Sequence, residues 1–244
     1  MIVFKNIIKA WNGVCVLNNI SMHVLRQSVH CLVGPSGSGK SVMLKHAAGL
    51  LMPDSGHVLV EGIDVASLRT HADFCALYDV CQMVAQSPTL FDHLTVFENV
   101  LLGFGAVCLK TTPEDSYACE RALCDVGCET FIKKYPYELS VGVQKRISIA
   151  RALVKRPKII LYDEPTTSVD SHAKGLIDDL IVKITHERLI TSCVVTHELS
   201  SVRNIASHVT FLENGHILYD GSPNAFFACE QPDVRAFCEA YATV

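Results

Sequence analysis

The stretch Gly34-Pro-Ser-Gly-Ser-Gly-Lys-Ser41 places three glycines ahead of a lysine and a hydroxyl side chain. A short apolar run, 29–33, comes directly before it, and apolar residues recur at helical spacing from Ser41 to Leu51. This order predicts a buried strand, a tight glycine-rich loop and a helix. Such a unit is typical of α/β folds with a parallel sheet.

The composition of this loop suits a polyphosphate ligand. Glycines let the backbone curl so that successive N–H groups point at one anion, and the following helix N-terminus adds partial positive charge. We expect Lys40 to reach the β- and γ-phosphates and the Ser41 hydroxyl to bind Mg²⁺. A chance match occurs on the order of once in a hundred chains of this length. The loop therefore predicts a P-loop NTPase.

Two adjacent carboxylates stand far downstream, where the apolar run 159–162 ends in Asp163 and Glu164. Ligands of open α/β sheets bind at the carboxyl ends of the strands. Asp163 is thus a candidate Mg²⁺ partner, and Glu164 is placed to polarise an attacking water. A solvated acidic turn is the alternative, and the complete phosphate loop makes it the weaker one.

The rest of the chain divides into regions that differ in their predicted secondary structure. Strand-like runs dominate 1–87 and 156–222, including a closing hairpin and a strand at 192–195 separated from 159–162 by a helical pattern. From 88 to 155 helical periodicity takes over, with Thr95 as a capping candidate. We expect one domain over 1–244, with a helical subdomain inserted into the β-rich core. The tail, 223–244, is amphipathic, and it packs on its own domain or on a dimer mate.

Composition narrows the functional classes. The 244 residues are 49% hydrophobic and 19% charged, with a formal charge of −4, which gives no electrostatic footprint for nucleic acid. We read no signal peptide at residues 1–13, and we find no apolar run near the roughly 20 residues that span a bilayer. We therefore expect a protein that acts on a membrane only through a partner.

Eleven scattered cysteines form no Cys-x-x-Cys pair. Cys124 and Cys128 are four residues apart and could share a helix face, but no second pair with zinc-like spacing accompanies them. We interpret the cysteines as reduced thiols that serve as small core residues.

Two further segments indicate which family of P-loop NTPases the chain resembles. The segment Leu139-Ser-Val-Gly-Val-Gln-Lys-Arg146 resembles the Leu-Ser-Gly-Gly-Gln signature of ABC transporter ATPases, and Thr196-His-Glu198 is similar to their switch segment. The resemblance implies an ABC ATPase fold, with a RecA-like parallel-sheet core, an antiparallel β subdomain and the helical insertion. It also implies that Ser140 and Gly142 face the γ-phosphate bound to the other subunit of a head-to-tail dimer. His197 would contact the γ-phosphate and hold the catalytic geometry.

Further positions fit the same family. Gln86 resembles the glutamine that senses Mg²⁺ and couples to the membrane subunit, and Asp170 resembles the aspartate that signals across the dimer. Trp11 stands where the family stacks an aromatic ring on adenine, although an ordinary core aromatic is the alternative. The resemblance assigns catalysis to Lys40, Glu164 and His197, and Mg²⁺ to Ser41, Gln86 and Asp163. The predicted nucleotide contacts are Trp11, Gly34, Pro35, Ser36, Gly37, Ser38, Gly39, Lys40, Ser41, Val42, Gln86, Ser140, Gly142 and Asp170.

The signature departs from the family pattern at Val141 and Val143, where glycine and glutamine are usual. A branched side chain at 141 could crowd the partner's site. A module that holds ATP but hydrolyses it slowly is therefore one alternative. A non-transport ABC ATPase is another, and the lack of a second cassette or coiled coil disfavours it.

Within the family, GKSVMLKH (39–46) and ILYDEPTTSVD (160–170) resemble the ATPases of Mla/Mce-type lipid transport systems. That resemblance implies a homodimer on the cytoplasmic face of the inner membrane. It would power phospholipid movement with an integral permease and a Mce-type lipid-binding protein. An importer for amino acids or another polar solute is the alternative.

Overall fold

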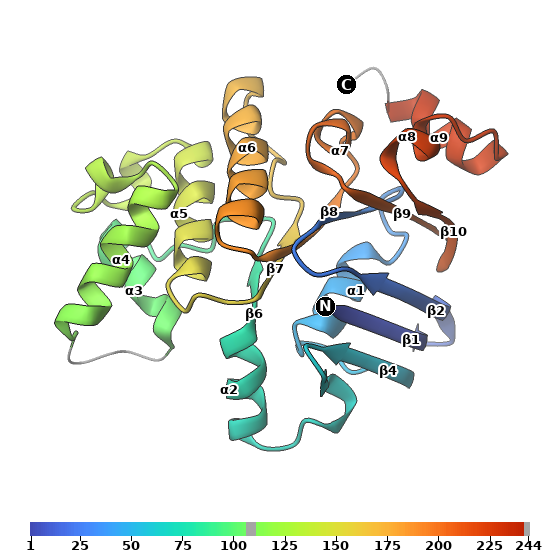
Figure 1. Cartoon of the computed structure of the whole chain (residues 1–244), viewed down its shortest axis with the longest axis horizontal. Helices are drawn as coiled ribbons and strands as arrows, with labels where there is room; N and C mark the ends of the chain where they lie inside the picture. The colour runs from blue at the N-terminus through green and yellow to red at the C-terminus, as the bar shows by residue number, and fades with distance from the viewer. Residues whose placement is uncertain (106–110, 242–244) are drawn as a thin grey trace.

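A computed structural model describes residues 1–105 and 111–241. Within them, six strands form the larger sheet, in the order β10-β9-β3-β8-β7-β6 (Figure 1). Neighbouring strands run parallel, except that β9 and β10 form an antiparallel hairpin. The strands are β3 (Val29–Val33), β6 (Cys81–Val84), β7 (Ile159–Asp163), β8 (Thr191–Thr196), β9 (His208–Glu213) and β10 (His216–Gly221).

A smaller antiparallel sheet has the order β2-β1-β4-β5 in the described residues. Its first hairpin turns at Asn12 and Gly13, which both take positive φ, 51° and 81°. Two such residues match the type I′ turn that suits the twist of a two-residue hairpin. The strands are β1 (Ile2–Trp11), β2 (Val14–Val24), β4 (Ser55–Val60) and β5 (Ile63–Asp64).

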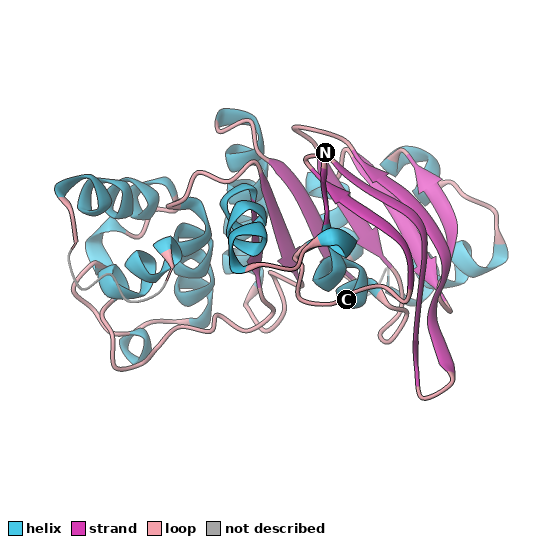
Figure 2. Ribbon diagram, turned by 90° about the horizontal axis from the view of Figure 1, so that it is seen from below, coloured by secondary structure: helices cyan, strands magenta, loops and turns pink. Residues whose placement is uncertain are grey.

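Helices α3, α4 and α5 form a group beside the larger sheet (Figures 1 and 2). The Thr95 cap is confirmed, because the Glu98 N–H donates to its hydroxyl at 3.3 Å while the Glu98 carboxylate accepts from the Thr95 N–H at 2.7 Å. The predicted combination of a parallel-sheet core, an antiparallel β subdomain and a helical group is confirmed, while the boundaries 88, 155 and 222 stay a prediction. The helices are α1 (Lys40–Ala47), α2 (His71–Val80), α3 (Val96–Leu101), α4 (Pro113–Asp125), α5 (Val141–Leu153), α6 (Ser171–Glu187), α7 (Leu199–Ile205), α8 (Pro223–Phe227) and α9 (Pro232–Tyr241).

Two hydrophobic clusters fill the interior, and alternate residues of β3 divide between them. Cys31 and Val33 belong to the cluster that also packs the helical group, whereas Leu32 belongs to the cluster beneath the antiparallel sheet. Phe226 and Phe237, from α8 and α9, are buried in the first cluster. The described part of the tail therefore packs on its own domain.

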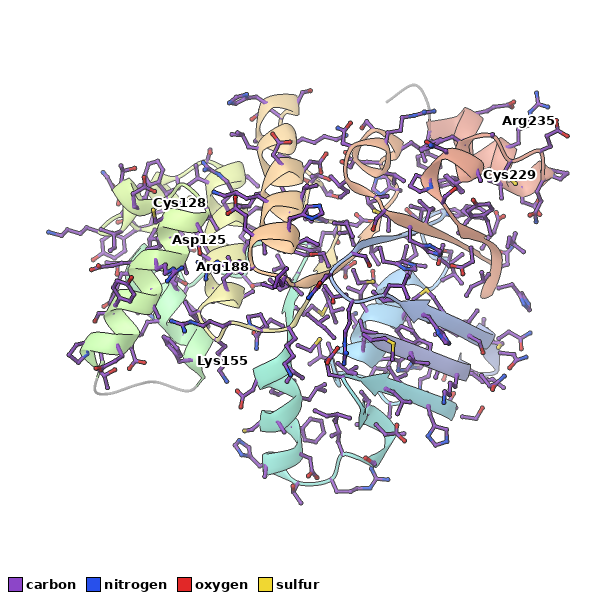
Figure 3. The ribbon with its side chains drawn as sticks, viewed as in Figure 1. Asp125, Cys128, Lys155, Arg188, Cys229 and Arg235 are labelled. Atoms are coloured by element: carbon purple, nitrogen blue, oxygen red, sulfur yellow. The ribbon has the colours of Figure 1, made fainter. Side chains whose placement is uncertain are left out.

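Cys124 and Cys128 do not share a helix face. Helix α4 ends at Asp125, and Cys128 lies beyond that end (Figure 3). Cys128 is buried, while Cys124 is exposed. At the same end of α4, Asp125 pairs with Arg188 just after α6 and so links the helical group to the core. Five of the described cysteines are buried thiols, and Cys108 lies outside the described residues.

The buried carboxyl of Asp178 gives a stability prediction. It is 2% exposed on α6, and burial raises its pKa to about 6. An unfolded carboxyl has a pKa near 3.9, so this group opposes folding increasingly as the pH rises from about 4 to about 6, by about 3 kcal/mol in full. We expect Asp178→Asn to unfold at a higher urea concentration than the wild type at about pH 8, with a much smaller difference at about pH 5. Asp179→Asn, at an exposed neighbour, is the control, and parallel pH profiles of Asp178→Asn and wild type would contradict the assignment.

Candidate functional site

The predicted phosphate loop lies between β3 and α1, where close packing requires glycine. A Cβ on Gly34 would lie 2.0 Å from the Leu212 carbonyl oxygen of β9. Gly39 takes φ 105° as the residue preceding α1, a left-handed conformation that side chains disfavour. The backbone can therefore turn sharply from the strand end into the helix.

Lys40 is held inside this loop. Its side chain is buried, and its ammonium donates to the carbonyl oxygens of Gly34 at 2.8 Å and Pro35 at 2.7 Å. Burial lowers its pKa, while the charges of Glu164 and Asp163 oppose that effect. The buried Ser38 hydroxyl has no hydrogen-bond partner in the part of the chain that the structure describes. The loop thus combines a cation with a spare hydroxyl, as an anionic ligand requires.

Ser41 and Asp163 bring two oxygen ligands together at the ends of α1 and β7. The Ser41 hydroxyl donates to Asp163 Oδ1 at 2.8 Å. Burial raises the pKa of Asp163, and this hydrogen bond opposes the rise. Hard oxygen donors beside a phosphate loop match the preference of Mg²⁺, so the residues fit the predicted ion.

Glu164 is the centre of a hydrogen-bonded group at the carboxyl ends of β6, β7 and β8. Its carboxylate accepts from Gln86 Nε2 at 3.1 Å and from the Thr167 hydroxyl at 3.0 Å, and it lies 3.1 Å from His197 Nδ1. Glu164 has φ 47°, a strained conformation that its N–H bond to Val195 O, at 2.9 Å, helps to hold. The structure therefore brings together the three side chains that the sequence predicted for hydrolysis and coupling.

Sequence reasoning missed two members of this group. Thr167 lies three residues after Glu164, so a local contact between their side chains could have been predicted from this spacing. Lys145 on α5 had no such signal, since its contact depends on the packing of α5 against the strand end. Its buried ammonium donates to the Glu164 carbonyl at 3.4 Å, and burial lowers its pKa. Lys145 thereby ties the signature helix to the backbone of Glu164.

Ser140, Gly142 and Asp170 lie at the N-termini of α5 and α6, which meet at Ala173. Ser140 Oγ accepts weakly from the Val143 N–H at 3.5 Å, and a Cβ on Gly142 would lie 2.7 Å from Ala173 Cβ. Asp170 accepts from the Ala173 N–H at 2.9 Å, and hydrogen bonds of this kind lower its pKa. Glycine at 142 is thus needed for the approach of the two helix ends.

Trp11 and the signature valine are both exposed. Trp11 ends β1 with 41% of its surface exposed, and Lys9 Nζ lies 5.3 Å from its ring centroid. The alternative of an ordinary core aromatic is therefore wrong. Val141 is 43% exposed in the first turn of α5, and Val42 is half-buried on α1. These side chains are available to a ligand or a second molecule.

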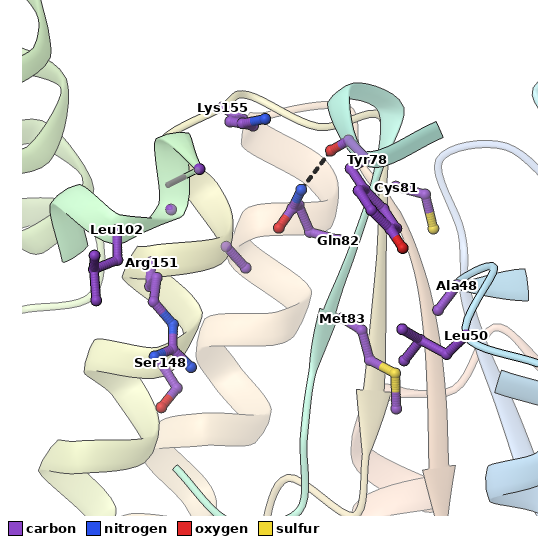
Figure 4. A pocket seen from close by; sticks show the side chains of 13 residues that line it. Ala48, Leu50, Tyr78, Cys81, Gln82, Met83, Leu102, Ser148, Arg151 and Lys155 are labelled. Atoms are coloured by element: carbon purple, nitrogen blue, oxygen red, sulfur yellow. Dashed lines mark hydrogen bonds between the residues drawn. The ribbon is translucent and has the colours of Figure 1, made fainter. Parts of the chain in front are cut away.

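A cavity of about 320 Å³ lies between the core and the helical group (Figure 4). Gln82 and Met83 of β6 form one wall. Ser148 and Arg151 of α5 form another, together with Lys155, which lies just after that helix. The Gln82 amide donates to the Tyr78 carbonyl, as the dashed line shows. The cavity thus borders the strand that leads to Gln86.

Comparison with known proteins agrees with this geometry. The family model described as ABC transporter matches residues 17–167. The L-cystine transport system ATP-binding protein TcyN of Escherichia coli (strain K12) is 36% identical over 245 residues, covering 97% of this chain and 96% of that protein. The glutamine transport ATP-binding protein GlnQ of the same strain is 35% identical, covering 91% and 92%.

Solved structures show the same likeness. The dimeric ATP-binding cassette MJ0796, in a post-hydrolysis state bound to ADP and Pi, superposes with a TM-score of 0.82 at 30% identity. The match covers 91% of this chain and 99% of that one. No helix in residues 1–105 and 111–241 combines the length and the apolar character that crossing a membrane requires.

Proposed function

The chain belongs to the ABC transporter family, and from that premise we propose that it is the ATP-hydrolysing subunit of an importer for an amino acid or another small polar solute. The observation that carries the motor role is the convergence of Lys40, Ser41, Asp163, Glu164 and His197 at one edge of the sheet. The names of the amino-acid transport relatives support the choice of cargo. The expected phospholipid cargo and Mce-type partner find no such support.

In the proposed reaction, each side chain has a distinct task. The Lys40 ammonium leaves its carbonyl partners to bind the phosphates of ATP, which exchanges neutral acceptors for charged ones. Glu164 orients and polarises the attacking water, while Gln86 and His197 hold its carboxylate in place. Ser41 and Asp163, with Gln86, would hold Mg²⁺, which neutralises phosphate charge when bound. The closed site excludes bulk water and positions the attacking water molecule.

A second copy of the chain completes the proposed site. Ser140 and Gly142 lie at a helix N-terminus, which favours an anion, and the exposed Val141 beside them can face a partner. We infer that this surface covers the ATP held by residues 34–41 of the other copy. The dimeric arrangement of the related cassette MJ0796 supports this inference.

The cavity between core and helical group is the proposed contact with the permease. Leu50 at its rim is 60% exposed, which favours an apolar partner segment, and Arg151 and Lys155 can bind its polar end. Because β6 connects the cavity wall at Met83 to Gln86, movement of the partner segment would be transmitted to Glu164. This contact would place the chain at the cytoplasmic face of the cell membrane.

The test of the cargo is co-purification followed by reconstitution. The chain is purified from detergent-solubilised membranes, its bound membrane proteins are identified, and the complex is placed in phospholipid vesicles. We expect ATP hydrolysis to rise when an amino acid and its binding protein are supplied. Stimulation by a lipid-binding protein instead would reject the importer and restore the lipid-transport alternative.

Trp11 provides a test of nucleotide placement. We expect Trp11→Ala to raise the Kd of ATP by about tenfold, because stacking of a base on an aromatic ring contributes about 1–3 kcal/mol. Trp11→Phe should retain most of the affinity. Trp11 is the only tryptophan in the chain, so ATP should quench the intrinsic fluorescence of the wild type. An unchanged Kd in Trp11→Ala, measured by calorimetry, would remove Trp11 from the site.

A further inference from the structure

Three titratable side chains meet on the larger sheet away from the nucleotide edge. His30 of β3 pairs in register with His208 of β9, and Asp220 of β10 pairs with Thr210 of β9. Because His208 and Thr210 are two residues apart, their side chains share one face of the sheet. One potential ligand atom from each of His30, His208 and Asp220 lies within 4.8 Å of the others. The register of three strands therefore produces a compact cluster.

Local contacts show how the cluster is connected. His30 Nε2 lies 2.8 Å from the Thr210 hydroxyl, and that hydroxyl donates to Asp220 Oδ1. His208 Nε2 lies 3.1 Å from the same Asp220 oxygen. The ring centroids of His30 and His208 are 4.8 Å apart, and the two rings are tilted by 38°. Asp220 Oδ1 thus contacts His208 directly and is connected to His30 through the Thr210 hydroxyl.

The burial and hydrogen bonding of His30 give independent evidence that the cluster can accept a ligand. Its side chain is fully buried, yet its Nδ1 has no hydrogen-bond partner among the described residues. Burial lowers its pKa to about 4, so the ring is neutral near pH 7 and keeps a lone pair for a ligand. His208 and Asp220 have side chains that are 27% and 49% exposed, which leaves a route from solvent.

We propose that His30, His208 and Asp220 form a binding site for a divalent transition-metal ion of the Zn²⁺ class. Two neutral imidazoles and a carboxylate are ligands that such ions prefer. A tetrahedral ion with bonds of about 2.0 Å needs ligand atoms about 3.3 Å apart. Binding therefore draws the half-exposed His208 and Asp220 inward, and solvent completes the coordination.

The location determines what an occupied site does. His30 lies four residues before Gly34, so the ion is about 13 Å along β3 from the phosphate loop and apart from the nucleotide. It would link β3 to the β9–β10 hairpin at the outer end of the sheet (Figure 1). The expected consequence is higher thermal stability, without a requirement for the ion in nucleotide binding.

The test is titration of the full chain with Co²⁺, followed by Zn²⁺ competition, in a non-chelating reductant. We expect one equivalent of Co²⁺ to give visible d–d absorption without the near-ultraviolet band of thiolate ligation. His208→Ala and Asp220→Asn should each raise the metal Kd by at least about tenfold and abolish the rise in Tm with Zn²⁺. His216→Ala, an exposed histidine on the same hairpin, is the matched control.

Unaltered ATP binding verifies that the variants are folded. A metal Kd that is unchanged in both His208→Ala and Asp220→Asn would overturn the proposal. So would an absorption band of thiolate ligation in the wild type. The cluster would then be only a hydrogen-bonded network of the sheet.

Discussion

Replacement of Glu164 by glutamine is expected to lower the rate of ATP hydrolysis by at least about 100-fold, because a positioned general base contributes that much or more. The amide has the same shape as the carboxylate and can still accept the Thr167 hydroxyl and lie beside His197. ATP affinity should therefore be nearly unchanged. The measurements are the steady-state release of phosphate with the permease present and the Kd of ATP by calorimetry.

The same variant reports on the dimer. When ATP is bound but not cleaved, the two copies should remain closed, so a stable ATP-dependent dimer is expected by light scattering. Glu187→Gln, at an exposed carboxylate near the end of α6, should behave as the wild type. Equal hydrolysis by Glu164→Gln and wild type would reject the role of Glu164 as base and leave the metal-cluster proposal untouched.

Lys40→Ala is expected to raise the Kd of ATP by about 100-fold or more. Hydrogen bonds from a charged group contribute about 1.5–3 kcal/mol each, and about 3 kcal/mol corresponds to 100-fold in affinity. Lys40 is buried among the loop carbonyls, so its removal takes the ammonium from the centre of the loop. At ATP concentrations below the Kd of Lys40→Ala, the rate of ATP hydrolysis should fall by at least about the same factor of 100.

The control for Lys40 is Lys183→Ala, which removes an exposed ammonium from α6 and should leave the affinity unchanged. Circular dichroism of Lys40→Ala should match the wild type, since the short alanine leaves α1 intact. If Lys40→Ala binds ATP with the wild-type enthalpy and Kd, residues 34–41 are not the phosphate site, and the proposed function fails with them.

Local sequence patterns were sufficient to predict several parts of this molecule. The phosphate loop is contiguous, so its glycines, lysine and serine could be read from eight neighbouring positions. The cap at Thr95 and the strand ending in Asp163 and Glu164 were also determined within a few residues, since capping and strand alternation depend on near neighbours. Helix α2 was missed, although Thr70 and Asp73 form a capping box at its start.

The sequence alone determined the fold family and the residue types of the site, because the contacts that define them are local or are carried by family motifs. Only the tertiary structure decided which distant residues meet. Gln86 and His197 reach Glu164 from 78 and 33 residues away, and His30 reaches Thr210 from 180 residues away. The strands neighbour one another out of chain order, with β3 between β9 and β8. Sheet register therefore sets these contacts, and no pattern of adjacent residues records it.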